Sequence, residues 1–320
     1  MRILVTGGAG YIGGAFVRAA LAAGHEPVVL DNLSTGHADA VPDGVELVRA
    51  DLRERSVLDP LLAASDAVVH FAALSIVPDS IADPVTYYGE NLGGFLALLE
   101  GVRENGPARL VFSSSAAVYG DGSGRPFREE DATLPVNPYG GTKLAMEQTL
   151  AHVAPALGLR AFSLRYFNAA GALPDHGERH DPETHLVPLA LEAALGLRTL
   201  TVFGEDYDTP DGTCIRDYVH VADLAEAHLA ALAALERGEG GVLNLGTGEG
   251  RSVREVLAAV ERVTERTLPV ARGPRRAGDP ARLVASVDRA AAVLGWRAAR
   301  PDLDGIVASA WDWARRLHGA

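Results

Sequence analysis

The sequence of 320 residues has little cysteine and lysine and no long apolar run. Its one cysteine, Cys214, excludes an intramolecular disulfide and a zinc cage of several thiolates. We therefore expect a reducing compartment and a cytoplasmic protein. No uninterrupted apolar stretch approaches the ~18 residues of a membrane span, and the chain opens with a short apolar run ended by glycines rather than a secretory signal. We expect neither a membrane protein nor an exported one.

Basic residues are scarce relative to acidic ones. The 29 Lys and Arg face 42 Asp and Glu, for a formal net charge of -13. Such a chain lacks the basic face that a nucleic acid or an anionic membrane requires, so neither is expected as a partner. A phosphorylated ligand must then be held by a few local arginines. Of the 29 basic residues 28 are arginine, a bias that indicates codon usage or a hot habitat, and the remaining one is Lys143.

The pattern of the first half predicts an α/β fold with a doubly wound parallel Rossmann sheet. Short β-rich runs at 2–6, 26–31, 45–49, 66–71, 108–114 and 159–165 alternate with Ala- and Leu-rich helical segments. From about residue 170, longer loops such as 171–177 and 204–212 predict a smaller C-terminal substrate-binding lobe. We expect a dinucleotide-binding domain at 1–169 and a lobe at 170–320, with some segments of the second returning to the first.

A glycine-rich turn follows the first expected strand. Gly7, Gly10 and Gly13 stand between that strand and a helical pattern. This spacing permits a tight turn, close approach of a pyrophosphate to backbone N–H groups, and close packing of helix on sheet. The motif therefore predicts dinucleotide binding.

Acidic residues end the next two expected strands. Asp31 lies 24 residues after Gly7, close to the interval of a ribose-binding acid. A carboxylate there accepts hydrogen bonds from the ribose hydroxyls and repels a 2′-phosphate, which favours NAD over NADP. Asp51, followed by Leu52, is expected near the adenine edge, with a turn-capping role as the alternative.

The spacing of Tyr139 and Lys143 predicts a catalytic pair. Positions i and i+4 share one face of a helix, so the phenol and the ammonium can project into one site. A free tyrosine has a pKa of about 10, and a nearby cation lowers it by stabilising the phenolate. Arginine does not reproduce a compact ammonium, so the only lysine of the chain stands where its chemistry is required.

Three hydroxyls, Ser113 to Ser115, end the fifth expected strand on the ligand side of the sheet. A serine there can donate to a sugar oxygen and order proton transfer to Tyr139. No Gly-x-Ser-x-Gly elbow surrounds these serines, so we do not expect a nucleophile.

Together these motifs resemble the extended short-chain dehydrogenase/reductase family over essentially the whole chain, with 164–168 (Leu-Arg-Tyr-Phe-Asn) as a further match. The segments 211–221 and 275–280 are similar to those of its UDP-hexose 4-epimerases. The resemblance implies epimerisation at C4 of a UDP-hexose, such as UDP-galactose to UDP-glucose, through a transient 4-keto sugar and a bound NAD.

The resemblance also implies residue roles. Tyr139 would take the proton of the 4-hydroxyl, Lys143 would lower the pKa of Tyr139 and bind the nicotinamide ribose, and Ser115 would hydrogen-bond the same hydroxyl. Further cofactor contacts would fall on Gly7, Gly10, Tyr11, Ile12, Gly13, Asp31, Asn32, Asp51, Leu52, Phe71, Ala72, Asn91 and Phe167. The nucleotide sugar would meet Asn168, Arg216, Arg276 and Asp279, in addition to Ser115.

Two positions depart from the family pattern. Ser75 stands where relatives often have a lysine, which puts one cofactor-side contact in doubt. Leu283 stands where relatives carry a bulky tyrosine or a smaller residue that gates the sugar pocket. Leucine leaves more room than tyrosine, so we hypothesise that UDP-N-acetylhexosamines are also accepted.

Other functions stay open at this point. A 4,6-dehydratase requires Asp-Glu after the strand-five hydroxyl, and Ala116-Ala117 stands there instead. A 4-epimerase for UDP-glucuronate or UDP-arabinose, or a non-catalytic NAD-binding regulator, are the alternatives. The ten histidines show no His-Glu-x-x-His or similar spacing, so no metal site is expected. The apolar helical segments at 91–104 and 143–157 suggest a homodimer interface, which the resemblance also implies.

Overall fold

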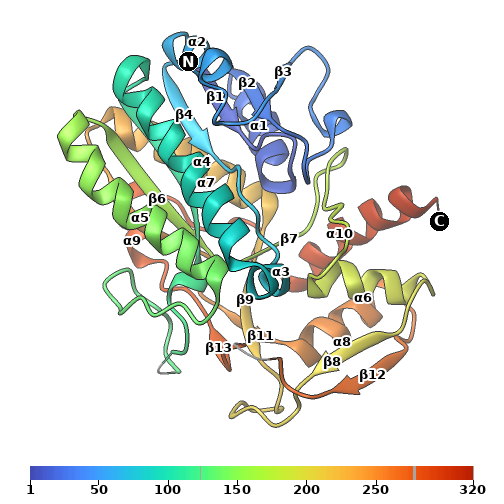
Figure 1. The fold of residues 1–320 in the computed structure, drawn as a ribbon. Coiled ribbons are helices and arrows are strands. Elements are labelled where there is room, and N and C mark those ends of the chain that lie inside the picture. The colour runs from blue at the N-terminus through green and yellow to red at the C-terminus, as the bar shows by residue number, and fades with distance from the viewer. Residues whose placement is uncertain (123, 277–278, 320) are drawn as a thin grey trace.

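A computed structural model describes residues 1–122, 124–276 and 279–319 of the chain. Within them, a seven-stranded parallel sheet runs in the order β10-β6-β5-β4-β1-β2-β3 (Figure 1). Its strands are β1 (Arg2–Thr6), β2 (Glu26–Asp31), β3 (Glu46–Arg49), β4 (Ala67–His70), β5 (Arg109–Ser115), β6 (Arg160–Tyr166) and β10 (Gly241–Leu245). The expected α/β fold is confirmed, and each of the six predicted strands lies within one residue of its expected bounds.

Helices cover both faces of this sheet. On one face α1 (Tyr11–Ala22) and α7 (Val221–Glu236) share a core with the strands, with α9 (Asp288–Leu294) beside α7. On the other face lie α2 (Arg55–Ala63), α4 (Pro84–Asn105) and α5 (Pro138–Leu157), and Figure 1 shows α4 and α5 side by side. Both faces of the strands are therefore buried, which explains why their sequences are nearly continuous apolar runs.

The parallel sheet also takes in segments from the second half of the chain. The edge strand β10 and the helix α7 come from the second half of the sequence yet pack on the first-half sheet. Only the last three residues of β10, Leu243–Leu245, are buried, and a five-residue strand after a long helix gives a weak pattern. Residues 2–166 therefore supply six of the seven strands of the sheet, and α7, β10 and α9 from the second half pack with them.

The C-terminal lobe is built around a second core. The helices α6 (Leu186–Ala194), α8 (Val253–Thr264) and α10 (Leu303–His318) pack together there. A small mixed sheet joins β11 (Gly250–Ser252), β9 (Ile215–His220), β13 (Arg282–Leu283) and β7 (Asn168–Ala170), and β8 (Leu200–Phe203) pairs with β12 (Val270–Gly273). The short elements η1 (Ala38–Ala40), η2 (Ala116–Val118) and α3 (Val77–Ala82) complete the connections.

The topology fixes where a ligand can bind. After β1 the chain continues to β2 and β3 on one side of the sheet, and after β4 it continues to β5 and β6 on the other side. The loops that leave the carboxyl ends of β1 and β4 therefore diverge. Open α/β sheets bind ligands in the crevice at this switch point. No helix of the described residues combines the length and apolar composition needed to cross a bilayer.

Candidate functional site

A cleft of about 860 Å³ opens at the carboxyl ends of β1, β4 and β5 and reaches β8 and β9 of the C-terminal lobe. All residues predicted for catalysis, for the cofactor and for the substrate line this one cleft. Ser75 and Leu283, the two departures from the family pattern, line it as well. Segments up to 272 residues apart in sequence, from Gly7 to Asp279, are thereby brought to one surface.

The glycine loop forms a cradle that side chains would fill. Gly7 has φ +72°, and a Cβ there would lie 2.5 Å from the backbone nitrogen of Ala72. A Cβ on Gly13 would lie 2.2 Å from the carbonyl oxygen of Gly7. Gly10 caps the N-terminus of α1 without a side chain, so the free N–H groups of the first turn face the cleft side. This geometry fits a pyrophosphate held by backbone donors.

Asp31 ends β2 with a buried carboxylate that orders the surrounding loop. Its Oδ2 accepts from the backbone N–H of Ala9 at 3.0 Å and its Oδ1 from that of Leu33 at 2.8 Å. A carboxylate oxygen has a second lone pair, so acceptor capacity remains for a ribose hydroxyl. Asn32 follows it and accepts from Ser34 N–H at 3.0 Å. The site fits NAD because a negative group stands where a 2′-phosphate would lie.

Asp51, which lines the cleft, is held by an arginine. Arg53 pairs with both carboxylate oxygens of Asp51 at 2.7 and 2.8 Å and with Glu90 at 2.8 Å. Hydrogen bonding from Arg53 lowers the pKa of Asp51 to about 2. Since Arg53 is engaged by two carboxylates, it is not free to bind a phosphate, which again fits NAD better than NADP.

Two residues predicted as cofactor contacts have structural partners of their own. The Asn91 amide accepts from Leu74 N–H at 2.7 Å and donates to Leu74 O and to Thr142 Oγ1, both at 3.0 Å. The Phe71 ring packs between Phe16 and His228 in the core. Asn91 therefore positions the loop after β4, and Phe71 offers mainly its backbone to the cleft.

The catalytic trio comes from α5 and the end of β5. Asn137 caps α5 by accepting from Gly140 N–H at 2.9 Å, which starts the helix directly before Tyr139. Lys143 is 2% exposed and donates from Nζ to Ser113 O at 2.8 Å. Its ammonium lies 5.9 Å from the centre of the Tyr139 ring. The helical i,i+4 spacing thus brings the two side chains into one site, as the sequence predicts.

Burial opposes both charges of this pair. Desolvation raises the pKa of Tyr139, and the Ser115 hydroxyl opposes that shift by hydrogen bonding. Desolvation lowers the pKa of Lys143 to about 7, and Glu147 opposes that shift through its negative charge. A phenolate and an ammonium are thus each costly alone in this site and stabilise one another when both form.

A buried network behind the trio was not foreseen from sequence. Glu147, one helical turn after Lys143, binds Arg165 of β6 at 2.6 Å and accepts from the Ser114 hydroxyl. Arg165 donates in turn to Tyr119 Oη at 2.9 Å. Two sequence signals indicate these residues. Arg165 lies within the matched 164–168 segment, and the helical spacing of α5 places Glu147 on the same face as Lys143. The network ties α5 to β5 and β6 beneath the lysine.

Two arginines and a carboxylate line the far end of the cleft. Arg216 of β9 donates to Pro280 O at 2.8 Å and pairs with Asp279 at 3.2 Å. Both Arg216 and Asp279 line the cleft. The Arg276 guanidinium stacks over Phe203 at 4.1 Å. Ala277 and Gly278 of the predicted 275–280 motif lie outside the described residues. The two guanidiniums can bind phosphate oxygens in this otherwise acidic chain.

Comparisons with known proteins agree with this geometry. Residues 3–246 match the model of the NAD dependent epimerase/dehydratase family. The UDP-glucose 4-epimerase of Lacticaseibacillus casei is 48% identical over 319 residues, 98% of this chain and 96% of the relative. The crystal structure of UDP-glucose 4-epimerase from Brucella ovis in complex with NAD has a TM-score of 0.94 at 47% identity, covering 98% of both chains.

A third structure carries both a cofactor and a nucleotide sugar. The UDP-glucose-4-epimerase from Stenotrophomonas maltophila, with bound NAD and formylated UDP-arabinopyranose, has a TM-score of 0.96 at 40% identity, covering 100% of this chain and 99% of its own. Since the family model covers well over half of the sequence and these relatives align end to end, the chain belongs to the NAD dependent epimerase/dehydratase family.

Proposed function

We propose that this chain is an NAD-dependent enzyme that epimerises C4 of a UDP-hexose and interconverts UDP-galactose and UDP-glucose. The observation that carries the proposal is the joint placement of Tyr139, Lys143 and Ser115 in one cleft with Arg216 and Arg276. The near full-length similarity to UDP-glucose 4-epimerases supports the same reaction.

The catalytic steps follow from the trio. NAD would supply the hydride acceptor and donor for C4 when bound along the Gly7–Gly13 loop. Tyr139 takes the proton of the 4-hydroxyl as the C4 hydrogen leaves and gives it back when the hydride returns. Lys143 stabilises the tyrosinate that takes this proton and that forms again when the proton is given back, and Ser115 orients the hydroxyl between itself and Tyr139. No net oxidation results, because the ketone formed at C4 is reduced again on its opposite face.

The substrate must be able to turn between the two half-reactions. Arg216, Arg276 and Asp279 lie at the far end of the cleft from the glycine loop, which suits an anchor on the diphosphate and the nucleotide. An anchor there leaves the sugar free to rotate while the UDP stays in place. Asn168, at the start of β7, lies between the trio and the arginines and is proposed to contact the sugar.

Acceptance of UDP-N-acetylhexosamines is the second part of the proposal. Leu283 on β13 is half-buried and lines the cleft. A leucine is shorter than a tyrosine and has no hydroxyl, so the wall near the sugar keeps room for an acetamido group. UDP-glucuronate and UDP-arabinose are the alternative substrates that the following experiment includes.

A substrate panel tests this proposal. Purified protein is incubated with UDP-galactose, UDP-N-acetylgalactosamine, UDP-glucuronate and UDP-arabinose, and the C4 epimers are separated by anion exchange. The proposal requires turnover of UDP-galactose. Turnover confined to a uronate or pentose would replace the substrate, and complete inactivity with NAD bound would favour a non-catalytic regulator. Absence of UDP-N-acetylgalactosamine turnover would refute the role given to Leu283.

The assembly expected is a homodimer through the outer face of α4 and α5. Val85, Tyr88 and Leu96 of α4 are 80%, 41% and 47% exposed. Gly89 and Gly93 have open space beside the backbone, so a second helix could approach closely along the same side. An exposed apolar stripe of this kind supports self-association. Sedimentation at a chain mass of 33.6 kDa distinguishes a monomer from a dimer.

A cytoplasmic location is proposed from the single, buried Cys214 alone.

A further inference from the structure

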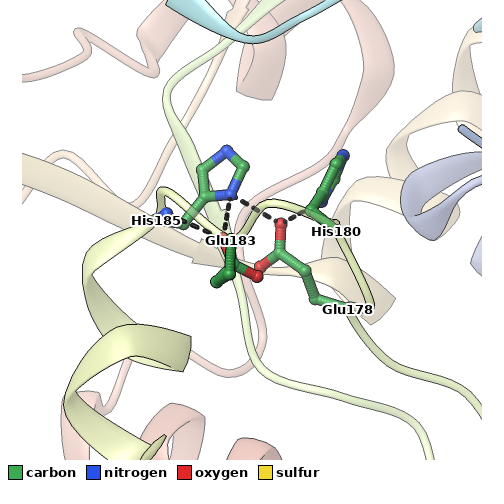
Figure 2. A group of neighbouring side chains, drawn as sticks. All are labelled: Glu178, His180, Glu183 and His185. Carbon is green, nitrogen blue, oxygen red and sulfur yellow. Dashed lines mark hydrogen bonds and ion pairs between the residues drawn. The ribbon is translucent and has the colours of Figure 1, made fainter. Parts of the chain in front are cut away.

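Four potential metal ligands gather in the loop between β7 and α6. Glu178, His180, Glu183 and His185 point toward a common centre (Figure 2), and one ligand atom from each lies within 4.8 Å of all the others. We refer to these residues as the His2Glu2 cluster. None of the proposed catalytic steps uses it.

The contacts within the cluster converge on the carboxylates. His185 Nδ1 lies 2.8 Å from Glu183 Oε1 and 3.0 Å from Glu178 Oε1. His180 Nδ1 lies 2.9 Å from the same Glu178 oxygen. With no ion present, these nitrogens bridge the carboxylates by donating hydrogen bonds. A cation between the four atoms would replace those protons and bind nitrogen and oxygen lone pairs directly.

The charge balance of the cluster favours a cation. The Glu178 and Glu183 side chains are only 8% and 7% exposed, and two carboxylates so close together repel one another in a poorly solvated site. Within residues 1–122, 124–276 and 279–319, no arginine or lysine forms an ion pair with either one. Arg179, between them in sequence, pairs instead with Asp39 at 2.6 Å. A divalent ion would neutralise the two carboxylates without requiring both histidines to be charged.

The ligand types select the class of metal. Two imidazoles and two carboxylates make an N2O2 set, which suits a four-coordinate zinc-type ion, whereas calcium and magnesium require six or more oxygen ligands. We propose that the His2Glu2 cluster binds one divalent transition-metal ion, with zinc as the best match. All four ligands are protein side chains, as in closed structural sites.

The position of the loop indicates what the ion would do. The same loop crosses to the nucleotide-binding domain, where His176 Nε2 donates to Tyr11 O at 2.6 Å and Asp175 pairs with Arg18 at 2.9 Å. On its other side Trp313 of α10 donates to Glu178 O at 3.0 Å. Glu178, His180 and His185 also line the cleft, so the ion would lie at the cleft wall. It would fix a segment that joins α10 to the start of α1, next to the glycine loop, and would thereby stabilise the folded protein.

The spacing explains why the sequence predicted no metal site. The ligands follow the pattern Glu-x-His-x-x-Glu-x-His within eight loop residues. In a His-Glu-x-x-His motif the two histidines come together because they lie on a helix, on which positions i and i+4 share a face. Here the loop itself turns the four side chains together, and its course was not predictable from periodicity.

Metal binding to the full chain tests the proposal. Protein is stripped with a chelator, its NAD content and circular dichroism are checked, and Zn²⁺ is titrated by calorimetry and by thermal unfolding. We expect one ion per chain and a rise in Tm of several degrees, with no comparable rise for Mg²⁺ or Ca²⁺. Cobalt(II) should give the visible absorption of a four-coordinate site.

Two variants locate the ion. His180→Gln removes one ligand that has a single hydrogen-bond partner, and the double variant with His185→Gln removes both imidazoles. Each should weaken Zn²⁺ binding by more than about 100-fold. His152→Gln, on the exposed side of α5, is the matched control and should bind like the wild type. If the double variant does not fold, the single variant and the cobalt spectrum decide.

Several results would overturn the proposal. They are the absence of stoichiometric Zn²⁺ binding by the wild type, equal binding by His180→Gln, or equal stabilisation by Ca²⁺. Epimerase activity does not enter these measurements, so they are independent of the function proposed above.

Discussion

Replacing Lys143 by methionine tests the central electrostatic step. Methionine has nearly the length of lysine and no charge, so it removes the ammonium with little change in packing. At the 5.9 Å that separates Nζ from the Tyr139 ring centre, a cation and a phenolate attract by about 3 kcal/mol at an effective dielectric of about 20. That energy corresponds to about two units in the pKa of Tyr139 and about 100-fold in tyrosinate at neutral pH.

The assay is the pH dependence of kcat for UDP-galactose. In the Lys143→Met variant we expect kcat at pH 7 to fall about 100-fold, and to recover about tenfold per unit of increasing pH, because the base then titrates at its higher pKa. The kcat of the wild type should reach its plateau at a lower pH than the kcat of the variant. NAD content is measured on the same samples, since Lys143 is also proposed to bind the nicotinamide ribose.

Lys143→Arg separates charge from shape. Lys143 is 2% exposed and its Nζ lies 5.2 Å from the centre of the Phe112 ring, so a broad guanidinium does not fit where a compact ammonium does. We expect a folded protein with most of its activity lost. Wild-type kcat in either variant, or a Lys143→Met profile with an unshifted midpoint, would refute the role assigned to the lysine.

Three further predictions concern stability and the substrate. First, the pKa of Lys143 is lowered from 10.5 in the unfolded chain to about 7 by burial, so the unfolded state binds the extra proton between these values. From pH 7 to pH 10.5 the NAD-free wild type should therefore gain stability relative to Lys143→Met, by at most about 4–5 kcal/mol, measured by urea unfolding; no relative gain would contradict the burial argument. Second, Arg276→Gln should raise KM for UDP-galactose about 10- to 100-fold with little change in kcat, because a charge-assisted hydrogen bond to phosphate is lost; an unchanged KM would remove Arg276 from the phosphate site. Third, Leu283→Tyr should lower turnover of UDP-N-acetylgalactosamine at least about tenfold and spare UDP-galactose; equal effects on both sugars would point to general disruption of the cleft.

The nucleotide-binding half was predictable because its signals are local. Each buried parallel strand is a short apolar run, and the residues that follow a strand must emerge at the same edge of the sheet. Gly7 after β1, Asp31 at the end of β2 and Ser115 at the end of β5 were therefore placed near one another by topology alone. The helical spacing of Tyr139 and Lys143 added the catalytic pair.

What could not be predicted depends on contacts between distant segments. β10 joins the sheet beside β6, and nothing in its five residues specifies that partner. The Glu147–Arg165 ion pair was not predicted, because the helical spacing places Glu147 on the face of Lys143 but does not specify an arginine on β6 as its partner. The His2Glu2 cluster depends on the path of a loop that is held by Tyr11 and Trp313 from opposite sides.

The position of the only lysine and its burial have one physical explanation in common. A chain that uses arginine for every other cation retains a lysine where the charge must be compact enough for a closed site, and the broad guanidinium does not meet that condition. Desolvation raises the pKa of Tyr139 and lowers the pKa of Lys143 toward 7, so burial moves the two values apart. The buried phenol holds its proton more firmly than in water and the buried ammonium holds its proton less firmly, so each charge is costly without the other. The attraction between the two charges offsets that cost, which is why a compact cation must lie beside the phenol for tyrosinate to form at neutral pH.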